Sequence, residues 1–116
     1  MLNSYLIYTY NADGTANGSV QTEVSLGFGE ALTPGHGVWQ HLGGRRFGVT
    51  VMGVLYDIKT GELHGFLKAR VLLTLNEAGD RMSGTDKVEI LDPNGNVMFT
   101  AIGNTSYKRI KFEPFN

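Results

Sequence analysis

Hydrophobic and polar residues alternate along most of this chain, and the alternation is clearest in its middle. Between residues 45 and 57, one set of alternate positions is apolar or glycine, whereas the other set also includes arginine and threonine. A period of two residues is typical of β-strands, whose successive side chains point to opposite faces. No amphipathic helix longer than a turn or two is indicated. The pattern predicts strands at Ser4–Tyr10, Thr15–Ser25, Val38–Leu42, Arg45–Asp57, Leu63–Leu75, Arg81–Leu91 and Val97–Phe112.

Turn sequences separate these predicted strands, at residues 11–14, 43–44, 59–62, 76–80 and 92–96. Each turn contains glycine, and Asn or Asp often stands beside it to hydrogen-bond the turning backbone. Such short connections pair each strand with the next, and strands this long twist and coil strongly. The sequence therefore predicts one all-β domain over residues 1–116, an up-and-down antiparallel meander that closes into a seven- or eight-stranded barrel. A β-sandwich is the alternative, although it usually needs longer crossovers.

Glycine also interrupts the pattern inside and between strands. A bulge or turn is expected around Gly103–Asn104 in the last strand. The one long connection is Gly27–Gly37, which contains four glycines, Pro34 and His36. Long loops on a rigid scaffold often hold binding chemistry, and histidine can act as an acid or base near neutral pH. The alternative is that the glycines only let the chain turn and that His36 has no chemical role.

Composition narrows the classes of function. The 116 residues contain no cysteine, which excludes disulfides and thiolate metal sites. The formal net charge is −1, and the charges are scattered, so a nucleic-acid partner is not expected. The chain shows neither a signal peptide nor an apolar run of membrane-spanning length, so we expect a cytoplasmic protein without a membrane partner.

The histidines and charged strand residues are the candidates for chemistry. His36 and His41 are five residues apart, so they point to opposite faces of a continuous strand, and we expect no metal site and no cofactor. Lys68 and Arg70 share a face with His64 and Phe66. If that face points inward it offers an anchor for an anion or enolate, and if it points outward these are solvated charges.

Asp86 shares a face with apolar residues of its predicted strand, including Val88 and Ile90. A carboxylate on an apolar face is either paired or functional, and we expect it to pair with Lys68 or Arg70.

Several segments resemble a known group of proteins. They are residues 33–39 (Thr-Pro-Gly-His-Gly-Val-Trp), 44–47 (Gly-Arg-Arg-Phe), 55–57 (Leu-Tyr-Asp), 65–70 (Gly-Phe-Leu-Lys-Ala-Arg), 73–75 (Leu-Thr-Leu) and the turn at 92–97. Together they resemble a group of small, largely uncharacterised bacterial proteins with a lipocalin-like, or calycin-type, barrel. The resemblance implies a barrel lumen that takes an apolar ligand, or that steers a cyclisation. Lipocalin-like chains often begin with a Gly-x-Trp strand that is absent here, so we expect an open seam in the barrel. Either a second subunit or the C-terminal segment Tyr107–Phe112 covers this seam, and we expect a homodimer.

Two functions from different classes follow. The first is a binding protein that takes a small apolar or aromatic molecule into its lumen. The second is a lumen-type cyclase or isomerase with His36 as acid or base and Arg70 or Lys68 stabilising negative charge. A packed barrel that acts only in protein association is a third. The residues expected to contact the ligand are His36, Trp39, Phe47, Tyr56, His64, Phe66, Lys68 and Arg70.

Overall fold

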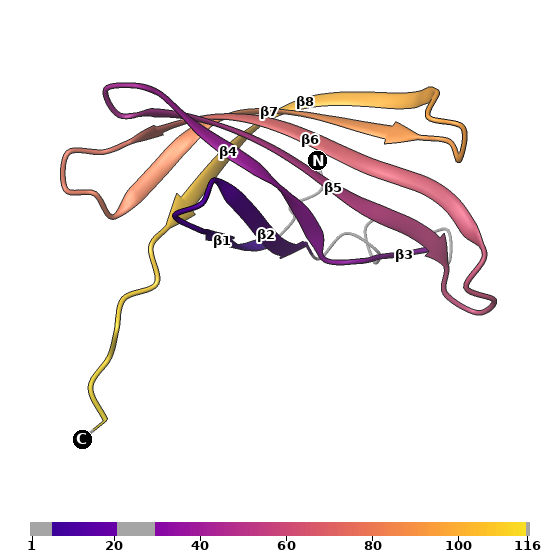
Figure 1. Cartoon of the computed structure of the whole chain (residues 1–116), viewed down its shortest axis with the longest axis horizontal. Helices are drawn as coiled ribbons and strands as arrows, with labels where there is room; N and C mark the ends of the chain where they lie inside the picture. The colour runs from indigo at the N-terminus through magenta and orange to yellow at the C-terminus, as the bar shows by residue number, and fades with distance from the viewer. Residues whose placement is uncertain (1–5, 21–29, 116) are drawn as a thin grey trace.

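A computed structural model describes residues 6–20 and 30–115 of the chain. Within these residues the fold is all-β and antiparallel, which confirms the predicted meander (Figure 1). The strands are β1 (Leu6–Tyr10), β2 (Thr15–Val20), β3 (Glu30–Leu32), β4 (Gly35–Gly43), β5 (Arg46–Asp57), β6 (Leu63–Leu75), β7 (Arg81–Leu91) and β8 (Val97–Lys108).

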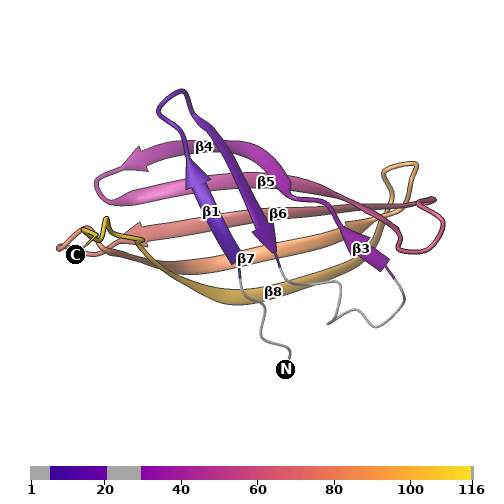
Figure 2. The same cartoon turned by 90° about the horizontal axis from the view of Figure 1, so that it is seen from below.

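The strands form one sheet in the order β1-β2-β4-β5-β6-β7-β8, and β3 pairs with the end of β5. Strands β4 to β8 form an arched layer, and β1 and β2 lie beneath it (Figure 1). Seen from below, β1 and β2 cross the direction of the other strands (Figure 2). The sheet is therefore a curled half-barrel with a concave face, on which the first two strands fold back, and a convex face.

The two edge strands of this half-barrel approach each other without pairing in the described part of the chain. Tyr8 of β1 and Tyr107 of β8 meet edge to face across the gap, with ring centroids 5.8 Å apart. Residues 109–115 then leave the sheet, and the Arg109 amide donates to the Asp80 carbonyl at 2.8 Å. We call the gap between β1 and β8 the seam. The homodimer in which a second subunit covers it stays a prediction.

Several predicted boundaries match, since β6 and β7 begin and end as the alternation indicates. The prediction of a long connection over Gly27–Gly37 is wrong for its second half, because Glu30–Leu32 forms β3 and Gly35–Gly43 forms β4. Glycine serves close packing there rather than turning, since a Cβ on Gly37 would lie 1.9 Å from the Thr50 carbonyl oxygen. Residues 4–5 and 21–29 of the predicted elements lie outside the described residues.

The last strand also differs from its prediction. It ends at Lys108 rather than Phe112, and Gly103 pairs regularly with Asp86, so the bulge expected there is wrong. The irregularity lies instead where Leu91 faces Val97, directly beside the turn at 92–96. The Asp92 carboxylate accepts the amides of Asn94 and Asn96, and this tight turn fixes the register next to it.

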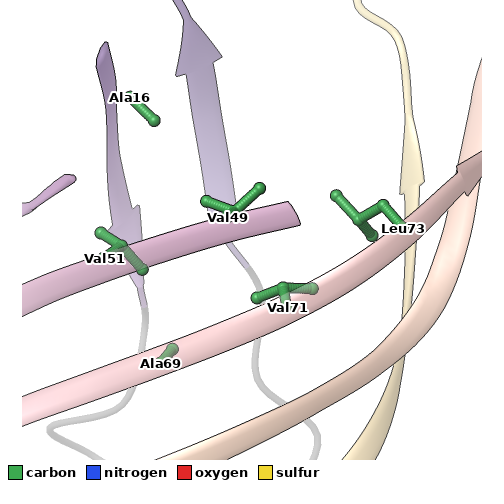
Figure 3. Packing of buried hydrophobic residues seen from close by; sticks show 6 residues of the cluster. All are labelled: Ala16, Val49, Val51, Ala69, Val71 and Leu73. Atoms are coloured by element: carbon green, nitrogen blue, oxygen red, sulfur yellow. The ribbon is translucent and has the colours of Figure 1, made fainter. Parts of the chain in front are cut away.

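The hydrophobic core lies on the concave face (Figure 3). Val49 and Val51 of β5 stand opposite Val71 and Ala69 of β6, and Leu73 follows along the same face. Ala16 of β2 belongs to the same buried cluster and packs on the side away from β6 in Figure 3. Burying a side chain of the size of Val or Leu contributes roughly 1.5–3 kcal/mol, so this face holds the half-barrel together.

Candidate functional site

Two cavities open on the concave face and share part of their walls. The larger, of about 860 Å³, lies along the seam and reaches the turn between β6 and β7. The smaller, of about 150 Å³, is lined by Tyr10, Trp39, Phe47, Val49, Leu73, Leu75 and Met82. Tyr10, Leu75 and Met82 belong to both linings, so the two cavities are adjacent parts of one hollow.

Five aromatic rings line this hollow, and we call it the aromatic basin, defined by Tyr8, Tyr10, Trp39, Phe47 and Tyr107. Tyr8 and Tyr10 alternate with exposed residues on β1 and therefore point to the same face. Their ring centroids are 6.1 Å apart, and those of Trp39 and Phe47 are 6.0 Å apart. The Trp39 indole N–H donates to the carbonyl of Asn11 at 2.8 Å, which fixes the ring against the turn between β1 and β2.

The tyrosine hydroxyls of the basin stay protonated well above neutral pH. Burial, and then the neighbouring Tyr107 and Asp86, raises the pKa of Tyr8 to about 12. Burial is also the main reason why the pKa values of Tyr10 and Tyr107 lie above their ordinary value. At neutral pH the basin thus offers neutral rings with hydroxyl groups that can donate and accept hydrogen bonds.

Two of the residues predicted to contact a ligand, Trp39 and Phe47, lie in the basin. Phe66, Lys68 and Arg70 lie on the convex face, because they alternate with the core residues of β6. The Arg70 guanidinium donates to the Glu89 carboxylate on the neighbouring strand, also on that face. Of the two orientations considered for Lys68 and Arg70, the structure therefore shows the outward one.

His36 does not lie in a loop, contrary to the sequence prediction. It belongs to β4, where it stands opposite Met52, and its side chain is exposed on the convex face. The structure therefore brings neither His36 nor Arg70 to the basin.

Asp86 does not pair with Lys68 or Arg70, and that prediction is wrong. It stands opposite Val71 on β6 and Gly103 on β8, on the concave face, whereas both cations lie on the other side of the sheet. Asp86 and Glu89 are three positions apart on β7, and successive side chains of a strand point to opposite faces. Glu89 therefore points to the convex face and Asp86 to the concave face.

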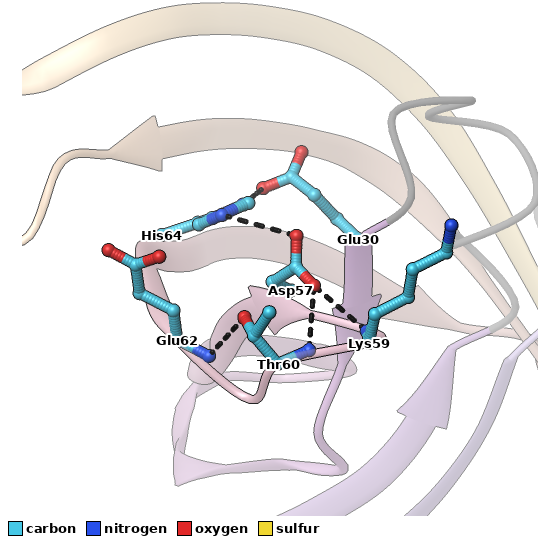
Figure 4. Close-up of polar contacts among 6 residues, drawn as sticks. All are labelled: Glu30, Asp57, Lys59, Thr60, Glu62 and His64. Atoms are coloured by element: carbon cyan, nitrogen blue, oxygen red, sulfur yellow. Dashed lines mark hydrogen bonds and ion pairs between the residues drawn. The ribbon is translucent and has the colours of Figure 1, made fainter.

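His64 and Tyr56 lie near the turn between β5 and β6, away from the basin. A bulge at Gly65 displaces His64 from the regular pairing, and its Nδ1 contacts Glu30 Oε2 at 2.9 Å (Figure 4). Its Nε2 lies 3.9 Å from the Asp57 carboxylate. Tyr56 is half-buried and stands opposite Ala31 of β3.

This cluster has a structural explanation. The Asp57 carboxylate accepts the amides of Lys59 and Thr60, which closes the turn, and these bonds hold its pKa below the ordinary value. The two carboxylates contact opposite nitrogens of the His64 ring, so all three groups cannot converge on one ion. Within residues 6–20 and 30–115, no group of three or more His, Asp or Glu side chains is arranged to hold a metal ion.

Sequence reasoning missed Tyr8, Tyr10 and Tyr107. Their alternation predicts one face for each strand, but strands at opposite ends of the chain meet only because the sheet curls. The signal that could have found them is the pair of tyrosines at alternate positions of the first strand, together with Tyr107 on the last strand of a predicted barrel.

No protein-family model, curated protein or solved structure matches this chain. In the described part of the chain, none of the secondary structure is a helix that could cross a membrane. The resemblance to lipocalin-like proteins stays a prediction.

Proposed function

We propose that this protein binds a small apolar or aromatic molecule in the aromatic basin. The observation that supports this most directly is the continuity of the two cavities along one wall of Tyr10, Leu75 and Met82. Ligand sites are typically concave, of about 300–1,000 Å³, and lined by apolar and aromatic side chains with a few polar groups. The basin fits that description in size, and the smaller cavity fits it in lining, whereas the wall of the larger cavity also contains polar and charged residues.

The aromatic rings suit a ligand that is itself flat or apolar. Offset or edge-to-face ring pairs contribute about 0.5–1.5 kcal/mol beyond the burial of area. Tyr8 and Tyr107 already meet in this way across the seam, and a ligand ring between or beside them extends the same packing.

The alternative of a lumen-type cyclase finds less support in the geometry. It assigned the acid or base to His36 and the stabilisation of negative charge to Arg70. Both side chains lie on the convex face, where neither can touch a molecule in the basin. Binding without catalysis needs neither group.

Trp39 provides the measurement, because it is the only tryptophan of the chain and lies in the basin. We expect saturable changes in its fluorescence, and a raised melting temperature, with some members of a panel of apolar and aromatic compounds. A ligand at about 100 times its Kd raises the free energy of unfolding by about 2.7 kcal/mol.

Neighbouring residues of β7 give matched variants. Met82 lines both cavities, whereas Ser83 is exposed on the other face. We expect Met82→Arg to abolish the response and Ser83→Arg to leave it intact. If circular dichroism shows that Met82→Arg does not fold, Met82→Phe replaces it, and we expect this larger apolar side chain to weaken the response by filling part of the two cavities. A folded wild-type protein that responds to no compound, or a Ser83→Arg variant that loses the response as fully as Met82→Arg, would contradict the proposal.

A further inference from the structure

Asp86 places a charged side chain on the concave face of the sheet. Among the Asp, Glu, Lys and Arg residues of β6, β7 and β8, only Asp86 has a register that places it there. Its strand neighbours on that face are Gly84 and Val88, and Val88 packs against the core. A carboxylate loses solvation next to apolar surface, so its presence calls for an explanation.

The carboxylate lies on the same concave face as the aromatic basin, although Asp86 is not among the residues that line either of its cavities. Asp86 stands opposite Gly103, and a Cβ built on Gly103 would lie 3.0 Å from Asp86 Oδ1, so glycine leaves room next to the acid. The negative charge of Asp86 contributes to the raised pKa values of Tyr8 and Tyr107, two walls of the basin. Asp86 also stands opposite Val71, a member of the buried cluster against which Tyr8 and Tyr107 pack, so the acid and these two rings share one region of the concave face.

The described part of the chain supplies no cation to this acid. No ion pair or hydrogen bond of the Asp86 side chain is found within residues 6–20 and 30–115. The lysines and arginines lie on the convex face, in turns or in the C-terminal segment; they are Arg45, Arg46, Lys59, Lys68, Arg70, Arg81, Lys87, Lys108, Arg109 and Lys111.

We propose that the ligand is an organic cation, a protonated amine on an apolar or aromatic body, whose ammonium group pairs with Asp86 beside Tyr8 and Tyr107. This inference rests on the proposed function. An ammonium group over the face of a tyrosine gains about 0.5–2 kcal/mol from the ring quadrupole, and the apolar surroundings strengthen its attraction to a carboxylate. The apolar body then packs against Tyr10, Trp39 and the rest of the basin.

The rim of the larger cavity carries charges of the opposite sign. Arg81, Lys108 and Arg109 line it near the end of β8, and they favour an anionic ligand. All three are exposed, so water and salt screen them, and Asp80 adds a negative charge at the same rim. The half-buried acid therefore outweighs the exposed bases in selecting the ligand.

Three probes with the same body separate these effects, namely phenylbutylamine, phenylbutanol and phenylbutanoic acid, each titrated by calorimetry at neutral pH and moderate salt. We expect the amine to bind about tenfold more tightly than the alcohol, and the acid to bind most weakly. Asp86→Asn keeps the size of the side chain and removes its charge, so we expect it to reduce the preference for the amine to about twofold or less. Affinity for the alcohol should not change.

Two control variants keep this test interpretable. Glu89→Gln makes the same chemical change three residues along β7, but on the convex face, and should leave the preference for the amine intact. Asp86→Glu keeps the charge and should retain most of the preference. Unchanged binding of the alcohol also shows that Asp86→Asn still folds.

The outcomes distinguish the two proposals. If the alcohol binds as tightly as the amine in the wild type, or the acid binds most tightly, the organic-cation inference is wrong while the proposed function stands. A preference for the amine that survives in Asp86→Asn also overturns the inference. If none of the three probes binds, and the wider panel fails as well, the proposed function fails and the inference fails with it.

Discussion

The two faces of the sheet differ less in sequence than in what covers them. Leu72 and Leu73 are identical neighbours on β6, yet Leu72 is 51% exposed on the convex face and Leu73 is 2% exposed on the concave face. The convex face also bears Val38, Met52 and Ile102, all exposed, so apolar residues alone do not identify the core. Curvature decides it, because only the concave side brings β1 and β2 back over the central strands.

The largest expected effect comes from truncating these two leucines in turn. We expect Leu73→Ala to lower the free energy of unfolding by about 2–5 kcal/mol, because it removes buried contacts and leaves a cavity. Leu72→Ala should change it by about 0.5 kcal/mol or less, since half of that side chain is already in water. Urea denaturation of both variants, followed by circular dichroism, measures the difference.

Equal losses in the two variants would mean that the convex face is also covered in solution. A second copy of the chain on that face would then be the first explanation to examine, and the dependence of the melting temperature on protein concentration would reveal it.

The second prediction uses the tyrosines of the concave face. In the unfolded chain tyrosine ionises near pH 10, whereas the pKa of Tyr8 in the folded protein is about 12. The folded state thus retains a proton that the unfolded state releases, so this stabilisation is complete below about pH 10 and is lost as the pH rises toward about 12. We expect stability to fall by on the order of 1–2 kcal/mol over that range from this group.

Tyr8→Phe isolates the contribution of Tyr8. The difference in unfolding free energy between wild type and Tyr8→Phe should be constant from about pH 8 to about pH 10 and should then shift against the wild type. Urea denaturation across the alkaline range gives both curves. Parallel curves throughout would show that the hydroxyl ionises as readily in the folded protein as in the unfolded one.

Much of the fold follows from the sequence, for reasons that these residues make plain. Alternation over residues 63–75 and 81–91, with glycine and Asn or Asp in the turns, specifies strands and register locally. Local patterns are weaker where glycine has two uses. At Gly35 and Gly37 it allows close strand packing, and the sequence interpretation took it for a loop.

The candidate site was less predictable, because it depends on contacts between distant strands. Trp39 and Phe47 were identified, but Tyr8 and Tyr107 are 99 positions apart and meet only across the seam. The partner of Asp86 was also misassigned. Asp86 and Arg70 lie on opposite faces of the sheet. This follows from the register between β6 and β7, which neither strand's sequence specifies alone.

The smallest expected effect concerns the ion pair that the convex face does contain. Arg70 and Glu89 are in contact, and the arginine side chain is 47% exposed while the glutamate is 12% exposed. A double-mutant cycle with Arg70→Ala and Glu89→Ala should give a coupling of about 0.2–1 kcal/mol, because water screens the charge on the arginine side. Raising the salt concentration should reduce it further. A coupling of several kcal/mol would mean that this pair is shielded from water. The convex face would then be covered in solution, as the concave face is covered by β1 and β2.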